Sequence, residues 1–180
     1  MVELTVELLP DGEVSPYLVQ EVRVGDGLEV RGPVGGHFVW EQPMGGPLLL
    51  IAGGSGMVPL RAILRHHRHI YSSVPVRLLY SARDIGDVIY HDELMALATS
   101  DEIDVSLTLT RTAPTGWHGY ARRVDRPMLA DVAWPSNAGP LAYICGPTSF
   151  VETVSGTLVD LGYDSTHIRT ERFGGTGDPA

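Results

Sequence analysis

The run Gly53-Gly54-Ser55-Gly56 has residue types that suit the binding of an anion. It follows the apolar run 48–52 and precedes Met57, Val58 and Pro59. Glycines allow positive φ and let a ligand reach the backbone without meeting a Cβ. Pro59 suits the first turn of a helix, whose unpaired N–H groups and positive dipole end attract phosphate. The spacing therefore predicts a strand, a glycine turn and a helix that could hold a phosphate group.

The glycine turn departs from three known sequence motifs. Pro59 replaces the third glycine of the dinucleotide pattern G-x-G-x-x-G. A phosphate loop of the G-x-x-x-x-G-K-[ST] type is excluded, because the chain contains no lysine. Met57 stands where the hydrolase elbow G-x-S-x-G requires its last glycine. Such a turn also serves close packing between a strand and a helix, so both interpretations stay open for the turn taken alone.

Two further segments place small or polar residues at the ends of apolar runs. Ser81-Ala82-Arg83-Asp84 follows the run 76–80, and Gly146-Pro147 follows the run 141–145, which ends in Cys145. A lone cysteine at such a position is more often a small apolar filler than a nucleophile. Three independent strand ends of this kind favour a ligand site more strongly than one does.

The chain from residue 45 onward alternates expected strands with expected helices. The expected strands are 48–52, 76–80, 103–109, 141–145 and 168–171, and the expected helices are 58–70, 92–99, 127–134 and 149–161. This alternation predicts the α/β class, with a five-stranded parallel sheet and helices on both faces. Ligands of such sheets bind at the carboxyl ends of the strands, where the three segments lie.

The first 44 residues have a different pattern. Residues 2–8 and 28–31 alternate apolar and charged side chains, which predicts strands with one solvated face. Ser15-Pro16 before Tyr17 predicts the start of a short helix. We interpret these elements as a partial antiparallel β-barrel, which cannot bury a core alone. We therefore expect two domains, residues 1–44 and residues 45–180.

The composition excludes several classes of protein. The contents of hydrophobic residues, 43%, and of charged residues, 19%, are ordinary for a globular protein. A net charge of −9 argues against a nucleic-acid partner. No apolar run approaches the ~20 residues that cross a bilayer, and the first residues do not resemble a signal peptide. A single cysteine, Cys145, leaves no internal disulfide and no multi-cysteine metal site. We expect a cytoplasmic protein with no metal and no membrane partner.

In their order and spacing, the three segments together resemble the pyridine-nucleotide half of ferredoxin–NADP reductase-like flavoenzymes. The matching residues are Gly53 to Pro59, Ala82-Arg83 with Asp87, Tyr90 and Glu93-Leu94, and Cys145-Gly146-Pro147. Residues near both ends of the chain resemble parts of the same family that lie beside the flavin. They are Gly12, Ser15, Tyr17 and Leu18, then Arg31-Gly32-Pro33 with Gly35 and Phe38, and finally Glu171-Arg172-Phe173-Gly174.

The resemblance implies an NAD(P)H-dependent flavoprotein oxidoreductase. In the family, a hydride passes from NADPH or NADH to FAD, and electrons then pass to a redox protein such as a ferredoxin, an oxygenase or a haem protein. Cys145 is implied to lie near the nicotinamide, with Glu171 as a polar or proton-handling partner. The residues implied to bind the nucleotide are Gly53, Gly54, Ser55, Gly56, Met57, Pro59, Ser81, Arg83, Arg111, Cys145, Gly146 and Pro147. Those implied to bind flavin are Gly12, Ser15 and Phe173.

The choice between the two nucleotides is open. Arg83, at the end of the second expected strand, could pair with the 2′-phosphate of NADPH, and Arg111 is a second candidate partner. Ser81 also favours NADPH. Asp84 favours NADH, because an acidic residue at this place accepts a hydrogen bond from a free 2′-hydroxyl. A solvated surface position is the alternative interpretation of Arg83.

The chain departs from the family at its beginning. The flavin domain of the family is a six-stranded barrel of roughly a hundred residues, and its Arg-x-Tyr-Ser type segment is absent here. The match begins at what would be the fifth barrel strand. We expect the chain to be a shortened version of a longer protein. The alternative is a non-catalytic nucleotide-binding module without bound flavin.

A third hypothesis is an α/β hydrolase that uses Ser55. Asp131 or Asp160 and then His167 follow it in the chain order Ser, Asp, His. The imperfect elbow at Met57 weighs against this hypothesis.

Two other clusters have structural interpretations. We interpret His66, His67 and His69 as a solvated helix end rather than a metal site, because no carboxylate or cysteine stands at ligand spacing. Trp117-His118-Gly119-Tyr120, after the third expected strand, could cover an adenosine, but we expect it to shield the sheet.

Overall fold

The computed structural model of the chain describes residues 3–9, 11–32, 36–100 and 103–174. The chain divides into two compact units, Met1–Gly36 and His37–Ala180. Each unit is described by itself below. The second unit carries the sheet, and all three strand-end segments belong to it.

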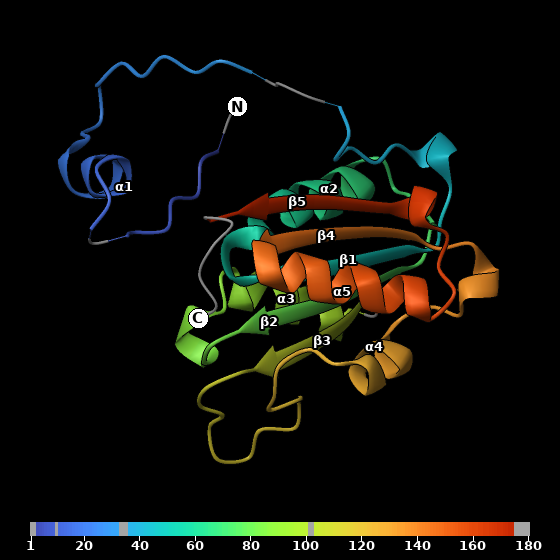
Figure 1. The fold of residues 1–180 in the computed structure, drawn as a ribbon. Coiled ribbons are helices and arrows are strands. Elements are labelled where there is room, and N and C mark those ends of the chain that lie inside the picture. Colours follow the sequence, from blue (N-terminus) through green and yellow to red (C-terminus); the bar gives the residue numbers. More distant parts are fainter. Residues whose placement is uncertain (1–2, 10, 33–35, 101–102, 175–180) are drawn as a thin grey trace. The chain divides into compact units, whose positions relative to one another are not determined.

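The second unit is built on a parallel sheet, drawn as arrows in Figure 1. Its strands, within the described residues, are β1 (Leu48–Gly53), β2 (Val76–Ala82), β3 (Asp104–Leu109), β4 (Leu141–Pro147) and β5 (Ile168–Phe173). They lie in the order β3-β2-β1-β4-β5, and all neighbours run parallel. The predicted α/β fold with five parallel strands is confirmed. Except for β3, each strand runs one or two residues further at its carboxyl end than the apolar runs indicated.

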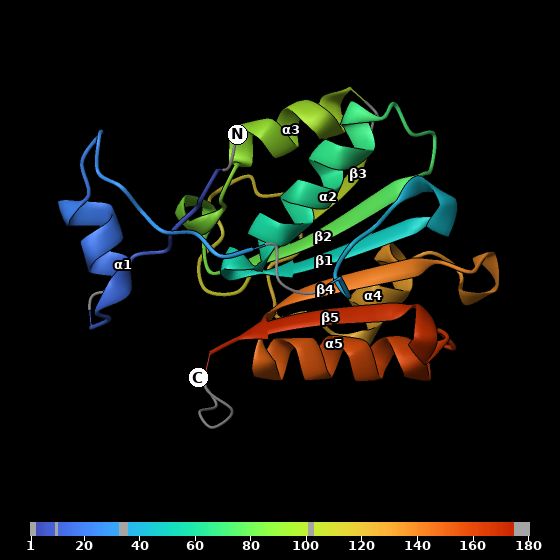
Figure 2. The ribbon, with the colours of Figure 1, turned by 90° about the horizontal axis from the view of Figure 1, so that it is seen from above.

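Helices cover both faces of the sheet (Figures 1 and 2). α2 (Met57–His69) and α3 (His91–Thr99) pack on one face, and α4 (Arg126–Val132) and α5 (Thr148–Asp160) pack on the other. Leu50 of β1 lies in the first core and Leu49 in the second, because successive strand residues point to opposite faces. All of β1 is buried, as expected of a central parallel strand covered on both sides.

The strand order creates a switch point between β1 and β4. From β1 the chain moves outward to β2 and β3, and it then returns to the other side of β1 as β4. Ligands of doubly wound sheets bind at the carboxyl ends of the two strands that flank such a point. The glycine turn after β1 and the Cys-Gly-Pro end of β4 therefore lie where a ligand is expected.

Trp134 fixes the opposite, amino edge of the sheet. Its Nε1 donates to the carbonyl oxygen of Leu48, the first residue of β1, at 2.8 Å. The Tyr163 hydroxyl donates to the carbonyl oxygen of Trp134 at 2.6 Å, and burial raises the pKa of Tyr163 to about 12. The Arg77 guanidinium lies 4.0 Å from the centroid of the indole ring. The segment after α4 is thereby held against the start of the central strand.

Residues 37–47, which precede β1, belong to the second unit and contact its core. Trp40 is 2% exposed, and its Nε1 donates to the Gly45 carbonyl oxygen at 2.9 Å. The Tyr143 hydroxyl of β4 donates to the Val39 carbonyl oxygen at 2.8 Å. The structure therefore divides between Gly36 and His37. The division into domains at residues 44 and 45 stays a prediction.

The prediction of a solvated histidine cluster is wrong for His67. This side chain is 7% exposed, lies under the Trp40 ring and places Nε2 2.7 Å from the Val74 carbonyl oxygen. Tertiary packing by Trp40, which is distant in sequence, buries it. His66 is part-exposed and lies 3.3 Å from a Glu41 carboxylate oxygen.

The first unit contains α1 (Val14–Pro16), which continues as a π-helical turn over Tyr17–Glu21. The predicted short helix is present, but it begins at Val14 with Glu13 as its N-cap, so the prediction that it starts at Ser15-Pro16 is wrong. No strand forms within residues 3–9 and 11–32, so the strands expected at 2–8 and 28–31, and the partial barrel, are not found in the described part of this unit. An alternating pattern forms a strand only where a partner supplies ladder hydrogen bonds. Of the residues in the resemblance, Pro33 and Gly35 lie outside the described residues.

In the ranges that the structure describes, no helix combines the length and the apolar character that a membrane crossing requires.

Replacing Trp40 with alanine tests whether the core of the second unit includes this segment. We expect Trp40→Ala to lower the free energy of unfolding by about 3–5 kcal/mol, because the indole is buried and hydrogen-bonded. Urea denaturation measures the change. Val39→Ala, at a 41% exposed neighbour, should stay within about 0.5 kcal/mol. Equal effects of the two variants would contradict the described packing.

Candidate functional site

The glycine turn joins β1 to α2 in one tight step. Gly54 to Gly56 form a single 3₁₀ turn, and the Met57 N–H closes it by bonding to the carbonyl oxygens of Gly54 and Ser55. Gly54 is exposed, has φ +54° and would place an added Cβ in open space. Ser55 is half-buried and Met57 is fully buried in the core. The accessible backbone of the turn is therefore that of Gly54 and Ser55, and Met57 anchors the helix.

Three glycines bring the ends of β1 and β4 into backbone contact. A Cβ on Gly56 would lie 2.1 Å from the Cys145 carbonyl oxygen. A Cβ on Gly146 would lie 3.2 Å from the Cα of Gly53 and 2.7 Å from the Phe150 ring. Both interpretations of the turn therefore have support, at different positions. Gly53, Gly56 and Gly146 serve close packing, and Gly54 leaves room for a ligand. The sequence patterns do not predict a role for Phe150, although its place one helical turn after Pro147 is a usable signal.

Cys145 and Glu171 lie side by side on β4 and β5, next to the switch point between β1 and β4. They are Cα partners in the register of β4 and β5. Cys145 is 4% exposed, whereas Glu171 is exposed. Burial, with the nearby negative charge of Glu171, raises the pKa of the Cys145 thiol from 9.0 to about 12. The thiol is therefore neutral at physiological pH, which agrees with a small packing residue and argues against a nucleophile.

Arg83 and Arg111 are brought together at the carboxyl ends of β2 and β3. The Arg111 N–H donates to the Arg83 carbonyl oxygen at 2.8 Å, and both side chains are exposed. Ser81 is buried and is the Cα partner of Gly53 in the register of β1 and β2. The Asp84 carboxylate accepts from the Gly86 N–H at 2.9 Å, so it caps its own loop. Two exposed guanidinium groups thus lie at the same edge of the sheet as the glycine turn.

The loop after β3 folds back along its own strand. The Leu109 N–H donates to the Tyr120 carbonyl oxygen, and the Tyr120 N–H donates to that of Leu107, both at 3.0 Å. Trp117 Nε1 donates to the Tyr120 carbonyl oxygen at 2.9 Å, and its ring packs against the core. The expectation that this segment shields the sheet is confirmed for Trp117.

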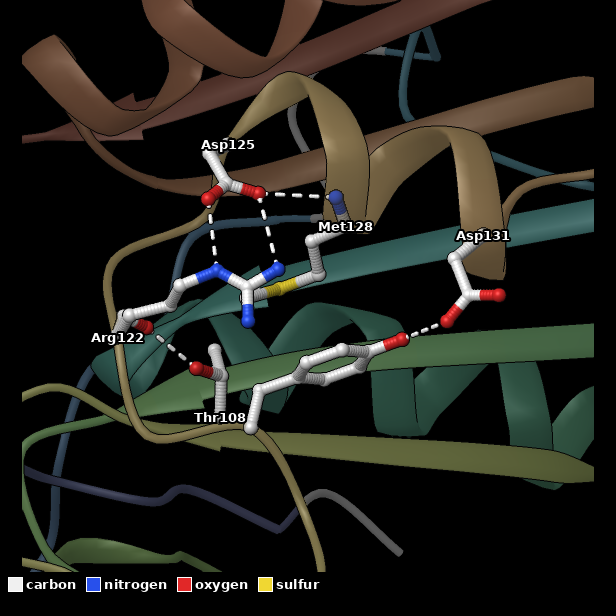
Figure 3. A network of polar contacts seen from close by, with 6 residues as sticks. Thr108, Arg122, Asp125, Met128 and Asp131 are labelled. Carbon is white, nitrogen blue, oxygen red and sulfur yellow. Dashed lines mark hydrogen bonds and ion pairs between the residues drawn. The ribbon is translucent and has the colours of Figure 1, made fainter.

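A polar network holds the return from this loop into α4 (Figure 3). The Thr108 hydroxyl donates to the Arg122 carbonyl oxygen, and Arg122 Nε donates to Asp125 at 2.7 Å. Asp125 also caps α4 by accepting from the Met128 N–H at 2.9 Å. These hydrogen bonds from Arg122 and Met128 lower the pKa of the Asp125 carboxyl. The network thereby connects the carboxyl end of β3 to the start of α4.

Asp131 is the partner of Tyr120 and belongs to no catalytic triad. The Tyr120 hydroxyl donates to its carboxylate, and this bond raises the pKa of the tyrosine. Asp160 ends α5 and His167 immediately precedes β5, which places both at the amino edge of the sheet. Ser55 follows β1 at the carboxyl edge. The hydrolase hypothesis is wrong, because Ser55 lies at the opposite edge of the sheet from Asp160 and His167. Only their order along the chain matched the hydrolase pattern.

The residues expected to bind flavin lie in both units. In the first unit, the Ser15 hydroxyl accepts from the Leu9 N–H at 3.0 Å, and the Gly12 N–H donates to the Leu9 carbonyl oxygen at 2.9 Å. Both groups thus stabilise a local turn. Phe173 ends β5 in the second unit and is 38% exposed. Across the described residues, no group of three or more His, Cys, Asp or Glu side chains could hold a metal ion.

Residues 50–156 match the family model described as the oxidoreductase NAD-binding domain. The chain belongs to the ferredoxin reductase-like oxidoreductases. It is 32% identical over 176 residues to the ferredoxin–NADP reductase B of Sorangium cellulosum, covering 95% of this chain and 71% of that protein. It is 31% identical over 176 residues to the glycine betaine monooxygenase reductase subunit of Chromohalobacter salexigens, covering 96% of this chain and 47% of that subunit.

Solved structures of this reductase-like family have the same fold. The FAD/NAD-binding domain of nitric oxide dioxygenase from Vibrio cholerae superimposes with a TM-score of 0.80 at 27% identity, covering 91% of this chain and 65% of that one. The Amycolatopsis cytochrome P450 reductase gives a TM-score of 0.77 at 26% identity, covering 93% and 50%. The chain spans about half the length of most of the curated relatives that it matches.

Alanine at the glycines should separate packing from ligand access. We expect Gly56→Ala to cost about 3 kcal/mol of unfolding free energy, because the methyl group meets a backbone carbonyl. Gly54→Ala should cost about 1–2 kcal/mol, because only the positive φ opposes it. Gly156→Ala, in a helix with open space around the added methyl group, should stabilise by up to about 1 kcal/mol. Urea denaturation ranks the three, and a Gly56→Ala variant as stable as Gly156→Ala would refute the close approach.

The buried thiol gives a pH-dependent prediction. Because Cys145 is the only cysteine, iodoacetamide reports on it alone. At pH 8 we expect the native protein to react at least about a hundredfold more slowly than the urea-unfolded chain. The raised pKa also means that the contribution of the thiol to stability is complete below about pH 9 and is lost as the pH rises toward 12. Native alkylation as fast as that of the unfolded chain would contradict the assignment.

Proposed function

We propose that the chain binds NADPH or NADH at the carboxyl edge between β1 and β4, and that it serves an NAD(P)H-dependent flavoprotein oxidoreductase. The observation that supports this most strongly is the backbone contact between the glycine turn and the Cys-Gly-Pro end of β4 at the switch point. A ligand at this edge meets a helix N-terminus and the exposed Glu171 carboxylate, and the neutral thiol of Cys145 is buried next to them. This combination suits a phosphate at one end and an uncharged ring at the other.

The pyrophosphate would lie against the turn. Gly54 is exposed and leaves the space of a Cβ empty, so a phosphate can approach the backbone. The N-terminus of α2, which begins at Met57 and has Pro59 in its first turn, adds the positive end of its dipole. Gly56 contributes indirectly, because its missing Cβ lets the helix start directly behind the turn.

The nicotinamide would lie at the end of β4. Cys145, which is 4% exposed, leaves no charged group at this strand end, and Gly146 and Pro147 end the strand without bulky polar groups. Glu171 provides a carboxylate beside the thiol, at the position where a proton or a polar ring substituent would be held. FAD, when bound, supplies the chemistry that accepts a hydride and releases electrons one at a time.

The arginines favour NADPH. Arg83 and Arg111 together offer two guanidinium groups to a 2′-phosphate. Ser81, buried near the end of β2, lies two residues before Arg83. Asp84, whose position favoured NADH, uses its carboxylate to cap the loop. We therefore propose that NADPH is the preferred nucleotide. Relatives described as reductase components of oxygenase systems support a redox protein, such as a ferredoxin, an oxygenase or a haem protein, as the acceptor in the cytoplasm.

A second candidate is a nucleotide-binding module that holds no flavin. The described residues of Met1–Gly36 contain no strand, and the hydroxyl of Ser15 is bonded to Leu9. These residues do not build a flavin site by themselves. Gly12, Ser15 and Phe173 as flavin ligands therefore stay predictions.

Flavin and nucleotide titrations separate the two candidates. The purified chain is incubated with FAD, its visible spectrum is recorded, and oxidation of NADPH and NADH is followed with ferricyanide as acceptor. Flavin-dependent oxidation supports the oxidoreductase. Nucleotide binding without flavin uptake supports the module. If neither nucleotide binds, the proposed site is wrong.

Replacing Arg83 with alanine tests the nucleotide preference. A charge-assisted hydrogen bond to phosphate contributes about 1.5–3 kcal/mol, so Arg83→Ala should weaken NADP⁺ binding by roughly tenfold or more. NAD⁺ binding should change by less than about twofold, because NAD⁺ has no 2′-phosphate. Isothermal titration calorimetry measures both dissociation constants. Equal losses for the two nucleotides would show that Arg83 does not read the 2′-phosphate.

A further inference from the structure

A cluster of charged and aromatic side chains joins α2 to α3. Two nitrogens of Arg61 approach the same oxygen of Glu93, at 2.8 Å from Nε and 2.7 Å from Nη2. Arg65 approaches the other carboxylate oxygen at 3.3 Å. The guanidinium carbon of Arg61 also lies 3.8 Å from the centroid of the Tyr90 ring. We call Arg61, Tyr90 and Glu93 the clamp.

The clamp is a partly buried, well-defined contact. The side chain of Arg61 is 12% exposed and that of Glu93 is 28% exposed. Partial burial acts to raise the pKa of the Glu93 carboxyl, but hydrogen bonds and charge from Arg61 and Arg65 outweigh it and hold the pKa below its ordinary value. The carboxylate is thus ionised and bound by two cations, which fixes its position better than an exposed ion pair would.

The clamp holds a residue in an unfavourable backbone conformation. Tyr90 has φ +61° and ψ +28°, the left-handed region that bulky side chains rarely adopt. Just before it, the Ile89 N–H donates at 3.2 Å to the buried hydroxyl of Tyr80 in β2. Tyr90 is therefore constrained from two sides, by β2 and by Arg61. Such strain persists only where the surrounding structure imposes it, and it concentrates at ligand sites and switches.

The clamp connects the two halves of the candidate nucleotide site. Arg61 lies in α2, little more than one turn after Gly56, in the helix that begins at the phosphate turn. Tyr90 ends the loop that starts at Arg83, directly after β2. Glu93 and Tyr90 belong to one short segment, so a rigid contact with Arg61 fixes where that loop returns to the fold. The backbone of Arg83 itself is held by the sheet, since Ser81 is paired with Gly53 and the Arg83 carbonyl oxygen accepts from the Arg111 N–H, and the contact with Arg61 fixes the rest of the loop that follows Arg83.

We propose that Arg61 is a positioning residue that sets the preference for a 2′-phosphorylated nucleotide. Through Tyr90 and Glu93 it orders the loop that carries Arg83 relative to the N-terminus of α2. When a nucleotide binds, Arg83 is then already placed for the 2′-phosphate, and little side-chain entropy is lost. This inference rests on the proposed function, because it requires nucleotide binding at the glycine turn and reading of the 2′-phosphate by Arg83.

A double-mutant cycle between Arg61 and Arg83 tests the inference. Arg61→Lys keeps the charge but loses the planar fork and the ring stacking, and Glu93→Gln keeps the shape but loses the charge. We expect either variant to reduce the preference for NADP⁺ over NAD⁺, measured as the ratio of the two dissociation constants, by about three- to tenfold. In the Arg83→Ala background, the same substitutions should leave the ratio unchanged within about twofold.

Glu41 provides a matched control for the substitution of Glu93. Glu41→Gln removes an exposed carboxylate that pairs with His66 at the other end of α2, and it should leave both dissociation constants unchanged. Equal weakening of both nucleotides by Arg61→Lys and Glu93→Gln, or an undiminished effect of these variants without Arg83, would overturn the inference and leave the proposed function standing. A wild-type protein that binds neither nucleotide, or binds both equally, would instead refute the proposed function or its NADPH preference.

Discussion

The close approach of Gly56 to the Cys145 carbonyl is the constraint on which the rest of the site depends. A side chain at position 56 would occupy the place of the β4 backbone, so α2 can begin behind its turn only if this residue is glycine. Gly146 meets the same requirement from the other side, against Gly53 and Phe150. The helix N-terminus and the end of β4 thereby become one rigid piece. A pyrophosphate at the turn and a ring at Cys145 are then held at a separation set by backbone contacts, which do not rearrange as side chains do.

The other end of the candidate site is held by different means. Arg83 and Arg111 lie on loops, yet the loops are joined by a backbone hydrogen bond beyond the last residues of β2 and β3. The network around Asp125 (Figure 3) fixes the return of the second loop, and the clamp fixes the return of the first. Binding residues that lie on loops usually have less well-fixed positions than residues on strands or helices. In this fold, the partly buried Arg61–Glu93 pair, the exposed Arg122–Asp125 pair and the Asp125 cap hold the two loops, so the edge of the sheet is arranged for its ligand before the ligand arrives.

The strands and helices of the second unit are predicted well from the sequence, because each depends on the pattern of a short run of neighbouring residues. Each run predicted to be a strand within residues 48–171 becomes a strand, and glycine or proline marks the ends of β1, β4 and β5. The sequence does not predict contacts between distant segments. Arg61 meets Glu93 across 32 positions, and the helical pattern alone does not show which arginine of α2 faces α3. His67 is buried because Trp40 covers it. Residues 2–8 and 28–31 have an alternating pattern that suits a sheet, but a pattern does not supply the partner strand.

Backbone NMR during titration with NADP⁺ tests the central claim most directly, namely that a nucleotide binds across the switch point between β1 and β4. We expect the largest amide shift changes at Gly54 to Met57 and at Gly146 and Thr148, with a second group near Arg83 and Arg111. Amides at the amino edge of the sheet, such as those of Ser136 to Gly139, should stay unchanged. Saturable shift changes centred on the amino edge, with none at Gly54 or Gly146, would contradict nucleotide binding between β1 and β4.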